Sequence, residues 1–114
     1  MEYVFRGQDH SGAVIAYQSG QTLAALFLLR TACEQWTRRF AGPNDYADVS
    51  MEKYMATLQD DFKSRFPSLP DIYSDLSADI HAATGSDALY EEVIDKLGLH
   101  FRARQLYEPA PKRQ

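Results

Sequence analysis

Two side chains of this protein stand out as candidates for acting on a phosphate or transferring a proton: His81 and Arg30. An imidazole exchanges a proton near neutral pH, and a guanidinium stabilises negative charge on phosphate oxygens. His81 lies near the end of a predicted helix that begins after Ser68, in line with Ser77. Arg30 lies in another predicted helix. These two residues are therefore the candidate catalytic residues.

Arg30 interrupts an apolar run and needs a partner, because burying an unpaired guanidinium is strongly unfavourable. Glu34 and Arg38 follow at positions i+4 and i+8. One interpretation is a ladder of ion pairs along a single helix. The other is that Arg30 and Glu34 meet the helix of His81 across the protein. Both interpretations draw on one set of polar network candidates: Arg30, Glu34, Arg38, Ser77 and His81.

Other patterns favour structural roles. Cys33 lies on the apolar face of its predicted helix, as a small buried side chain would. Asp75 and Asp79 share a helix face and have the oxygen ligands that hard cations prefer, but two carboxylates on a solvent-facing surface are commonplace. The sequence contains no glycine-rich phosphate loop and no His-Glu-x-x-His metal pair. We therefore expect no cofactor and no metal.

The formal net charge of −4 hides an uneven distribution. Residues 44–95 carry 12 acidic and 3 basic side chains, whereas residues 96–114 carry 5 basic and 1 acidic. The acidic middle argues against extensive wrapping by nucleic acid. A local basic patch stays open as a hypothesis, built from arginines that lie apart in the sequence: Arg30, Arg38, Arg39, Arg102 and Arg104.

The 114 residues are enough for one domain with one core. Helical periodicity predicts an all-α fold, an antiparallel bundle of four to five helices over residues 13–108. An irregular lead-in, residues 1–12, precedes the bundle, and a flexible tail, residues 109–114, follows it. The main predicted helices cover residues 21–40, 51–58, 68–83 and the segment that begins after Ser86.

The first of these main helices is apolar on most of its faces. Leu29, Cys33 and Trp36 recur at helical spacing along one side of it. Leu23 and Phe27 widen the apolar surface almost all the way round. Such a helix is expected at the centre of a bundle, buried on most sides. Ser19-Gly20 precedes it, and this pair either separates it from an earlier helix or lies inside one longer helix.

Helix termini also have local signals. Ser68 and Ser86 are predicted N-caps, because a serine hydroxyl accepts a hydrogen bond from a free N–H of the first turn. Gly98 lies inside the last helix, where glycine costs about 1 kcal/mol relative to alanine. A close contact with another helix at Gly98 would account for it.

The single cysteine excludes an internal disulfide framework. The longest apolar run, Leu23–Leu29, is far shorter than the roughly 20 residues that cross a bilayer. We therefore expect a cytoplasmic protein with no membrane partner.

Three segments resemble HEPN-type helical domains, and more narrowly an uncharacterised bacterial C-terminal HEPN-like family: Leu26–Trp36, Leu76–His81 and His100–Arg104. The resemblance implies a bundle that often dimerises and is part of a longer bacterial protein. The family's ribonuclease motif is an arginine followed by a histidine on the same helix. His81 matches that histidine, but Asp75 or a neighbour stands where the arginine is expected.

Two functions follow. The favoured one is a non-catalytic helical interaction or dimerisation domain, which forms a homodimer or contacts other domains of a longer chain. The alternative is a metal-independent HEPN-type ribonuclease, in which His81 acts with arginines from other helices. RNA or a nucleotide would then be the ligand.

Overall fold

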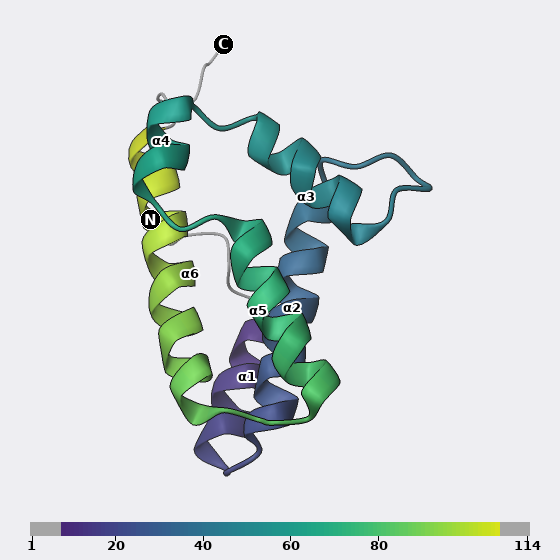
Figure 1. Cartoon of the computed structure of the whole chain (residues 1–114), viewed down its shortest axis with the longest axis vertical. Helices are drawn as coiled ribbons and strands as arrows, with labels where there is room; N and C mark the ends of the chain where they lie inside the picture. Colours follow the sequence, from purple (N-terminus) through teal and green to yellow (C-terminus); the bar gives the residue numbers. More distant parts are fainter. Residues whose placement is uncertain (1–7, 108–114) are drawn as a thin grey trace.

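The computed structural model describes residues 8–107, which form six α-helices around one hydrophobic core (Figure 1). The helices are α1 (Gln8–Gln18), α2 (Thr22–Arg38), α3 (Ala47–Ala56), α4 (Asp60–Arg65), α5 (Leu69–Ala82) and α6 (Asp87–Tyr107). The predicted all-helical bundle is confirmed. The described part has six helices rather than four to five, because α1 and the short α4 each form a separate helix. None of the helices described is long and apolar enough to cross a membrane.

The central helix is α2, which contacts α1, α3, α5 and α6. Its buried apolar side chains are Ala25, Leu26, Leu29, Cys33 and Trp36. Its first turns are different, because Leu23 is 38% exposed and Phe27 is 51% exposed. The expectation of burial on most sides therefore holds for the middle and end of α2, and fails at its beginning.

The helix α1 begins at Gln8, so residues 8–12 are helical and the predicted irregular lead-in needs correction. Gly12, which suggested a loop, has a packing role. A Cβ atom at this position would lie 3.3 Å from Cδ1 of Leu28, so the missing side chain lets α1 approach α2 closely. Residues 1–7 and the tail predicted at 109–114 lie outside the described residues.

Gly20 separates α1 from α2. Its φ of 81° lies in the left-handed region that glycine adopts at little cost. The N–H of Gln21 then donates to the carbonyl oxygen of Ala16 at 2.8 Å, which closes the turn. Of the two arrangements left open by the sequence, the structure has the break, and α1 and α2 form a helical hairpin.

The two predicted serine caps are present. The Ser68 hydroxyl accepts a hydrogen bond from the N–H of Asp71 at 3.1 Å, and the Ser86 hydroxyl accepts one from the N–H of Leu89 at 3.1 Å. The opposite end of α5 is closed by Ala83 in the left-handed conformation, with a φ of 55°. Alanine is an uncommon choice there, because its Cβ is crowded in this conformation.

Gly98 does not lie at a close helix crossing. The nearest neighbours of a Cβ atom at this position are the guanidinium atoms of Arg102 on the same helix, the closest at 3.4 Å. The predicted contact with another helix is therefore wrong, and an alanine fits at ordinary van der Waals distance.

We predict that Ala83→Gly and Gly98→Ala each stabilise the protein by about 0.5–1 kcal/mol. The first change relieves a strained φ, and the second lowers the conformational entropy of the unfolded chain inside a helix. Urea denaturation measures both. Gly85→Ala is the opposite control, since its φ of 65° favours glycine and the change should destabilise. A loss of stability in Ala83→Gly or Gly98→Ala would contradict this account of the backbone.

Candidate functional site

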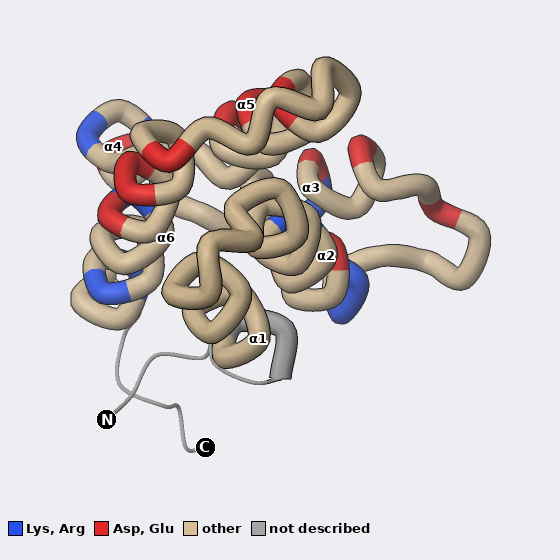
Figure 2. The backbone as a smooth tube through the Cα atoms, turned by 90° about the horizontal axis from the view of Figure 1, so that it is seen from below, with Lys and Arg blue, Asp and Glu red and all other residues tan. Residues whose placement is uncertain are grey.

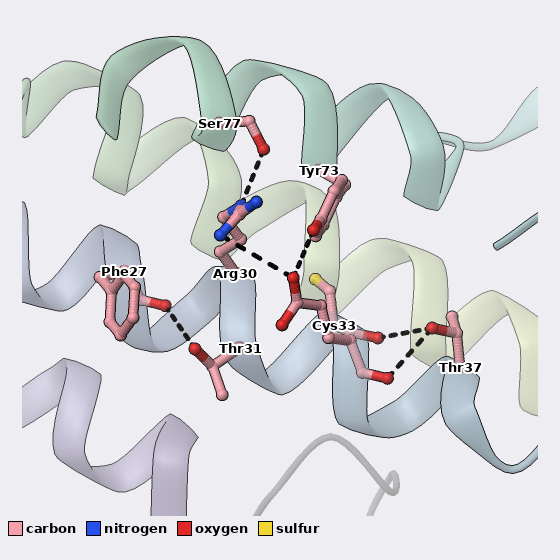
Figure 3. Close-up of polar contacts among 8 residues, drawn as sticks. Phe27, Arg30, Thr31, Cys33, Thr37, Tyr73 and Ser77 are labelled. Carbon is pink, nitrogen blue, oxygen red and sulfur yellow. Dashed lines mark hydrogen bonds and ion pairs between the residues drawn. The ribbon is translucent and has the colours of Figure 1, made fainter. Parts of the chain in front are cut away.

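Arg30 and Glu34 meet α5 where α2 packs against it (Figure 3). Nε of Arg30 donates to the Ser77 hydroxyl at 2.8 Å, and Nη1 of Arg30 lies 3.8 Å from Oε2 of Glu34. The Tyr73 hydroxyl donates to the same oxygen of Glu34. The guanidinium carbon of Arg30 also lies 4.9 Å from the centre of the Tyr73 ring. We call these four residues the α2–α5 cluster.

Every charge of the α2–α5 cluster has an internal partner. The side chains of Arg30 and Glu34 are each 27% exposed, so the pair is only partly solvated. Burial, together with the hydrogen bond to Glu34, raises the pKa of Tyr73 to about 12. The Tyr73 hydroxyl therefore stays protonated and continues to donate at neutral pH. The guanidinium of Arg30 is oriented toward Ser77, Glu34 and the Tyr73 ring rather than toward solvent.

The structure brings together three of the five predicted network residues, Arg30, Glu34 and Ser77, and it adds Tyr73. Tyr73 lies four residues before Ser77, so the two share a side of α5. That spacing was the available signal for a residue that the sequence analysis missed. Arg38 is exposed, and no ion pair joins it to Glu34 within residues 8–107. The single-helix ladder therefore ends after its first pair.

His81 lies outside the α2–α5 cluster. It is exposed in the last turn of α5, one turn beyond Ser77. Among the described residues, no hydrogen bond, ion pair or ring contact joins His81 to another side chain. The two candidate catalytic side chains, His81 and Arg30, are therefore not assembled into one site in this structure.

Asp79 has a structural role that the sequence did not reveal. The residue is 8% exposed, and its carboxylate accepts hydrogen bonds from the N–H groups of Gly85 at 2.7 Å and Ser86 at 3.1 Å. It thus fixes the connection between α5 and α6, while Asp75 is exposed. In the described part of the chain, no three His, Cys, Asp or Glu side chains form a group that could hold a metal ion.

The buried histidine is His100 of α6, which the sequence analysis did not single out. Its side chain is 0% exposed. Nδ1 lies 2.7 Å from the carbonyl oxygen of Pro67, and Nε2 lies 2.7 Å from the Tyr54 hydroxyl. His100 therefore connects α6 to α3 and to the segment before α5. Its position in the sequence indicates burial, because His100 follows Leu97 by three residues and Val93 by seven and so lies on the same apolar face.

The partners of His100 determine its protonation. A carbonyl oxygen can only accept, so Nδ1 carries the proton and Nε2 accepts from the Tyr54 hydroxyl. The rings of Phe62 and Phe101 also lie against the imidazole, at centroid distances of 5.2 and 5.0 Å. This burial lowers the pKa of His100 to about 4, against the opposing effect of the Pro67 carbonyl. The ring is therefore neutral at physiological pH and acts in packing.

We predict that mild acid weakens the fold through His100. Because the folded-state pKa of about 4 lies below the ordinary value of 6.5, the unfolded chain takes up the proton more readily. The contribution of His100 to the free energy of unfolding is complete at a pH above the ordinary pKa. It is lost as the pH falls toward the pKa of the folded state. By about pH 5 the free energy of unfolding should have dropped by about 2 kcal/mol. Urea denaturation across this pH range measures the change.

Two variants separate this effect from general acid sensitivity. His81→Ala removes an exposed histidine and should keep the full pH dependence of the wild type. His100→Gln does not titrate and should lose most of it. Equal pH dependence in His100→Gln and the wild type would refute the role of His100.

The predicted basic patch is divided in the structure. Arg39 and Arg104 converge on Trp36, with their guanidinium carbons 4.1 and 5.1 Å from the ring. Arg102 is exposed on α6, and being two residues from Arg104 it faces a different side of the helix. Arg30 is held in the α2–α5 cluster. The five arginines therefore do not form one continuous surface for a polyanion.

Cys33, the single cysteine, is fully buried in the core. Burial, with a smaller effect of Glu34, raises the pKa of its thiol to about 12. A protonated, inaccessible thiol is unreactive, which fits the structural role expected from the sequence.

Two hollows accompany these side chains. One, of about 580 Å³, is an apolar groove over the start of α2 and is lined by Gln21, Leu23, Ala24, Phe27, Leu28 and Ile80. The other, of about 400 Å³, lies beside the α2–α5 cluster and is lined by Asp48, Met51, Glu52, Pro70, Tyr73, Ser74 and Ser77. The charged residues that line the second hollow, Asp48 and Glu52, both carry carboxylates. This hollow therefore disfavours an anionic ligand.

No protein-family model, no curated protein and no solved structure matches this chain.

We predict that Tyr73→Phe destabilises the protein by about 1–3 kcal/mol, because Glu34 loses a charge-assisted hydrogen bond at a partly buried site. Ser74→Ala is a matched control on the same helix. Ser74 is exposed, so its removal should change stability by less than about 0.5 kcal/mol. Thermal unfolding of both variants tests this, and a Tyr73→Phe protein as stable as the wild type would show that the α2–α5 cluster contributes nothing.

Proposed function

We propose that this chain is a non-catalytic helical interaction and dimerisation domain of the HEPN-like type. The observation that carries the proposal is the apolar groove over the start of α2. Phe27 and Leu23 line it and are 51% and 38% exposed, although the same helix is otherwise the most deeply covered element. Exposed aromatic and aliphatic side chains around a hollow are typical of surfaces that bind another protein.

The placement of the polar side chains supports a non-catalytic role. Phosphodiester cleavage needs an acid–base group and a cation at the same phosphate. His81 is exposed at the end of α5, and Arg30 is bound to Ser77 and Glu34. The field on α5 is also unfavourable, since its exposed Asp75 would repel a phosphate.

The cellular setting is part of this proposal. Cys33 is buried and has no disulfide, so the fold does not depend on an oxidising compartment. We place the domain in the cytoplasm, within a longer bacterial protein or as a separate chain.

We predict that the purified protein leaves single-stranded RNA and transfer RNA intact. The wild type and the His81→Ala variant should be indistinguishable in a gel-based cleavage assay. Cleavage by the wild type that disappears in His81→Ala would overturn the proposal and establish the ribonuclease alternative. Arg38→Ala is the control for a general loss of positive charge, since Arg38 is exposed and lies outside the α2–α5 cluster.

A further inference from the structure

The chain contains one long stretch without charge. Between Asp9 and Arg30 there is no Asp, Glu, Lys or Arg, although 25% of all residues are charged. This stretch forms most of α1, the turn at Gly20 and the first half of α2. Figure 2 shows the hairpin end of α1 and α2 in tan, while acidic positions lie along α3, α4, α5 and α6.

The same stretch exposes large apolar side chains. Ile15 of α1 is 64% exposed, in addition to Leu23 and Phe27 of α2. Ala13, Ala16 and Tyr17 are the residues of α1 that pack on the core, so Ile15 lies on the outward side of that helix. The groove itself is lined by Leu23 and Phe27 of α2. We call the groove residues and the turn between α1 and α2 the hairpin face.

The distribution of charged residues indicates which partner binds the hairpin face. In a two-fold dimer the same patch lies on both subunits, so a charge near the axis meets a like charge. The protein has a net charge of −4, and the acidic excess falls on residues 44–95, which form α3, α4, α5 and the start of α6. Two copies that meet through those helices repel one another. Two copies that meet through the hairpin face do not.

A different protein as partner fits this surface less well. An acidic protein gains association rate and specificity from a basic partner by using its charged surface. The hairpin face offers such a partner no charge. Depletion of charge combined with exposed aromatic and aliphatic groups is instead the composition of the centre of a self-associating interface.

The carboxylates at the border of this face are engaged in hydrogen bonds. Asp87 accepts from the Thr22 hydroxyl, and Glu91 accepts from the Tyr17 hydroxyl at 2.7 Å. These bonds hold the acidic start of α6 against the hairpin at its edge. They leave an apolar centre with a polar border, which is the usual arrangement in stable interfaces.

We propose that a second copy of this chain packs on the hairpin face, with Phe27 near the centre of a two-fold interface. This inference rests on the proposed function, since it names the partner and the surface of the same interaction domain.

Sedimentation equilibrium of the full chain, from low to high micromolar concentration, tests the inference. We expect a dimer for the wild type. Phe27→Glu places a carboxylate in the apolar centre and should weaken dimerisation at least roughly 30-fold, as for a central hot-spot residue. Leu23→Glu changes another exposed side chain of the groove and should weaken dimerisation in the same direction. Leu106→Glu is the matched control, because Leu106 is 84% exposed on α6, away from this face, and should leave the dimer unchanged.

The outcomes are distinguishable. A wild type that stays monomeric at high micromolar concentration overturns the inference. A dimer that persists in Phe27→Glu but is lost in Leu106→Glu overturns the hairpin face while the interaction-domain proposal stands. RNA cleavage that depends on His81 overturns that proposal itself. Circular dichroism and urea denaturation of each variant confirm that a loss of dimer is not a loss of fold.

Discussion

The structure depends on how α2 is covered. This helix is apolar on most of its faces, and apolar surface left in water is unfavourable in proportion to its area. Four other helices pack against it and bury Leu26, Leu29 and Trp36. The same chain leaves Phe27 half exposed, because none of the described helices lies over that side of α2. The position of α2 therefore determines both the core and the surface that is available to a partner.

The polar side chains inside the bundle serve this packing. Arg30 can lie at the contact between α2 and α5 because Glu34 and Ser77 satisfy its guanidinium there. His100 can be fully buried because the Pro67 carbonyl and the Tyr54 hydroxyl bind its two nitrogens. A buried polar group without such partners would be strongly destabilising. These groups hold helices together, and their reactive atoms face one another rather than a substrate.

The sequence predicted the helical class and several helix boundaries, since apolar periodicity and serine caps are local signals. It singled out His81 and did not identify His100 as the buried histidine. His81 lies beside an apolar face and is exposed, whereas His100 lies on an apolar face and is buried. Periodicity identifies a side of a helix, but whether that side is covered depends on elements distant in the sequence. The same limit explains why Phe27 was expected to be buried and why Tyr73 was missed.

The central claim is that the functional surface of this protein is the uncovered, uncharged side of the hairpin formed by α1 and α2. Backbone amide NMR spectra recorded over a wide range of protein concentration test it most directly. The account predicts that shifts change with concentration in residues 11–29 and around Ile80, while the surroundings of Asp75 stay constant. Concentration-dependent shifts confined to α3, α4 or α6, or no change in the hairpin, would contradict it.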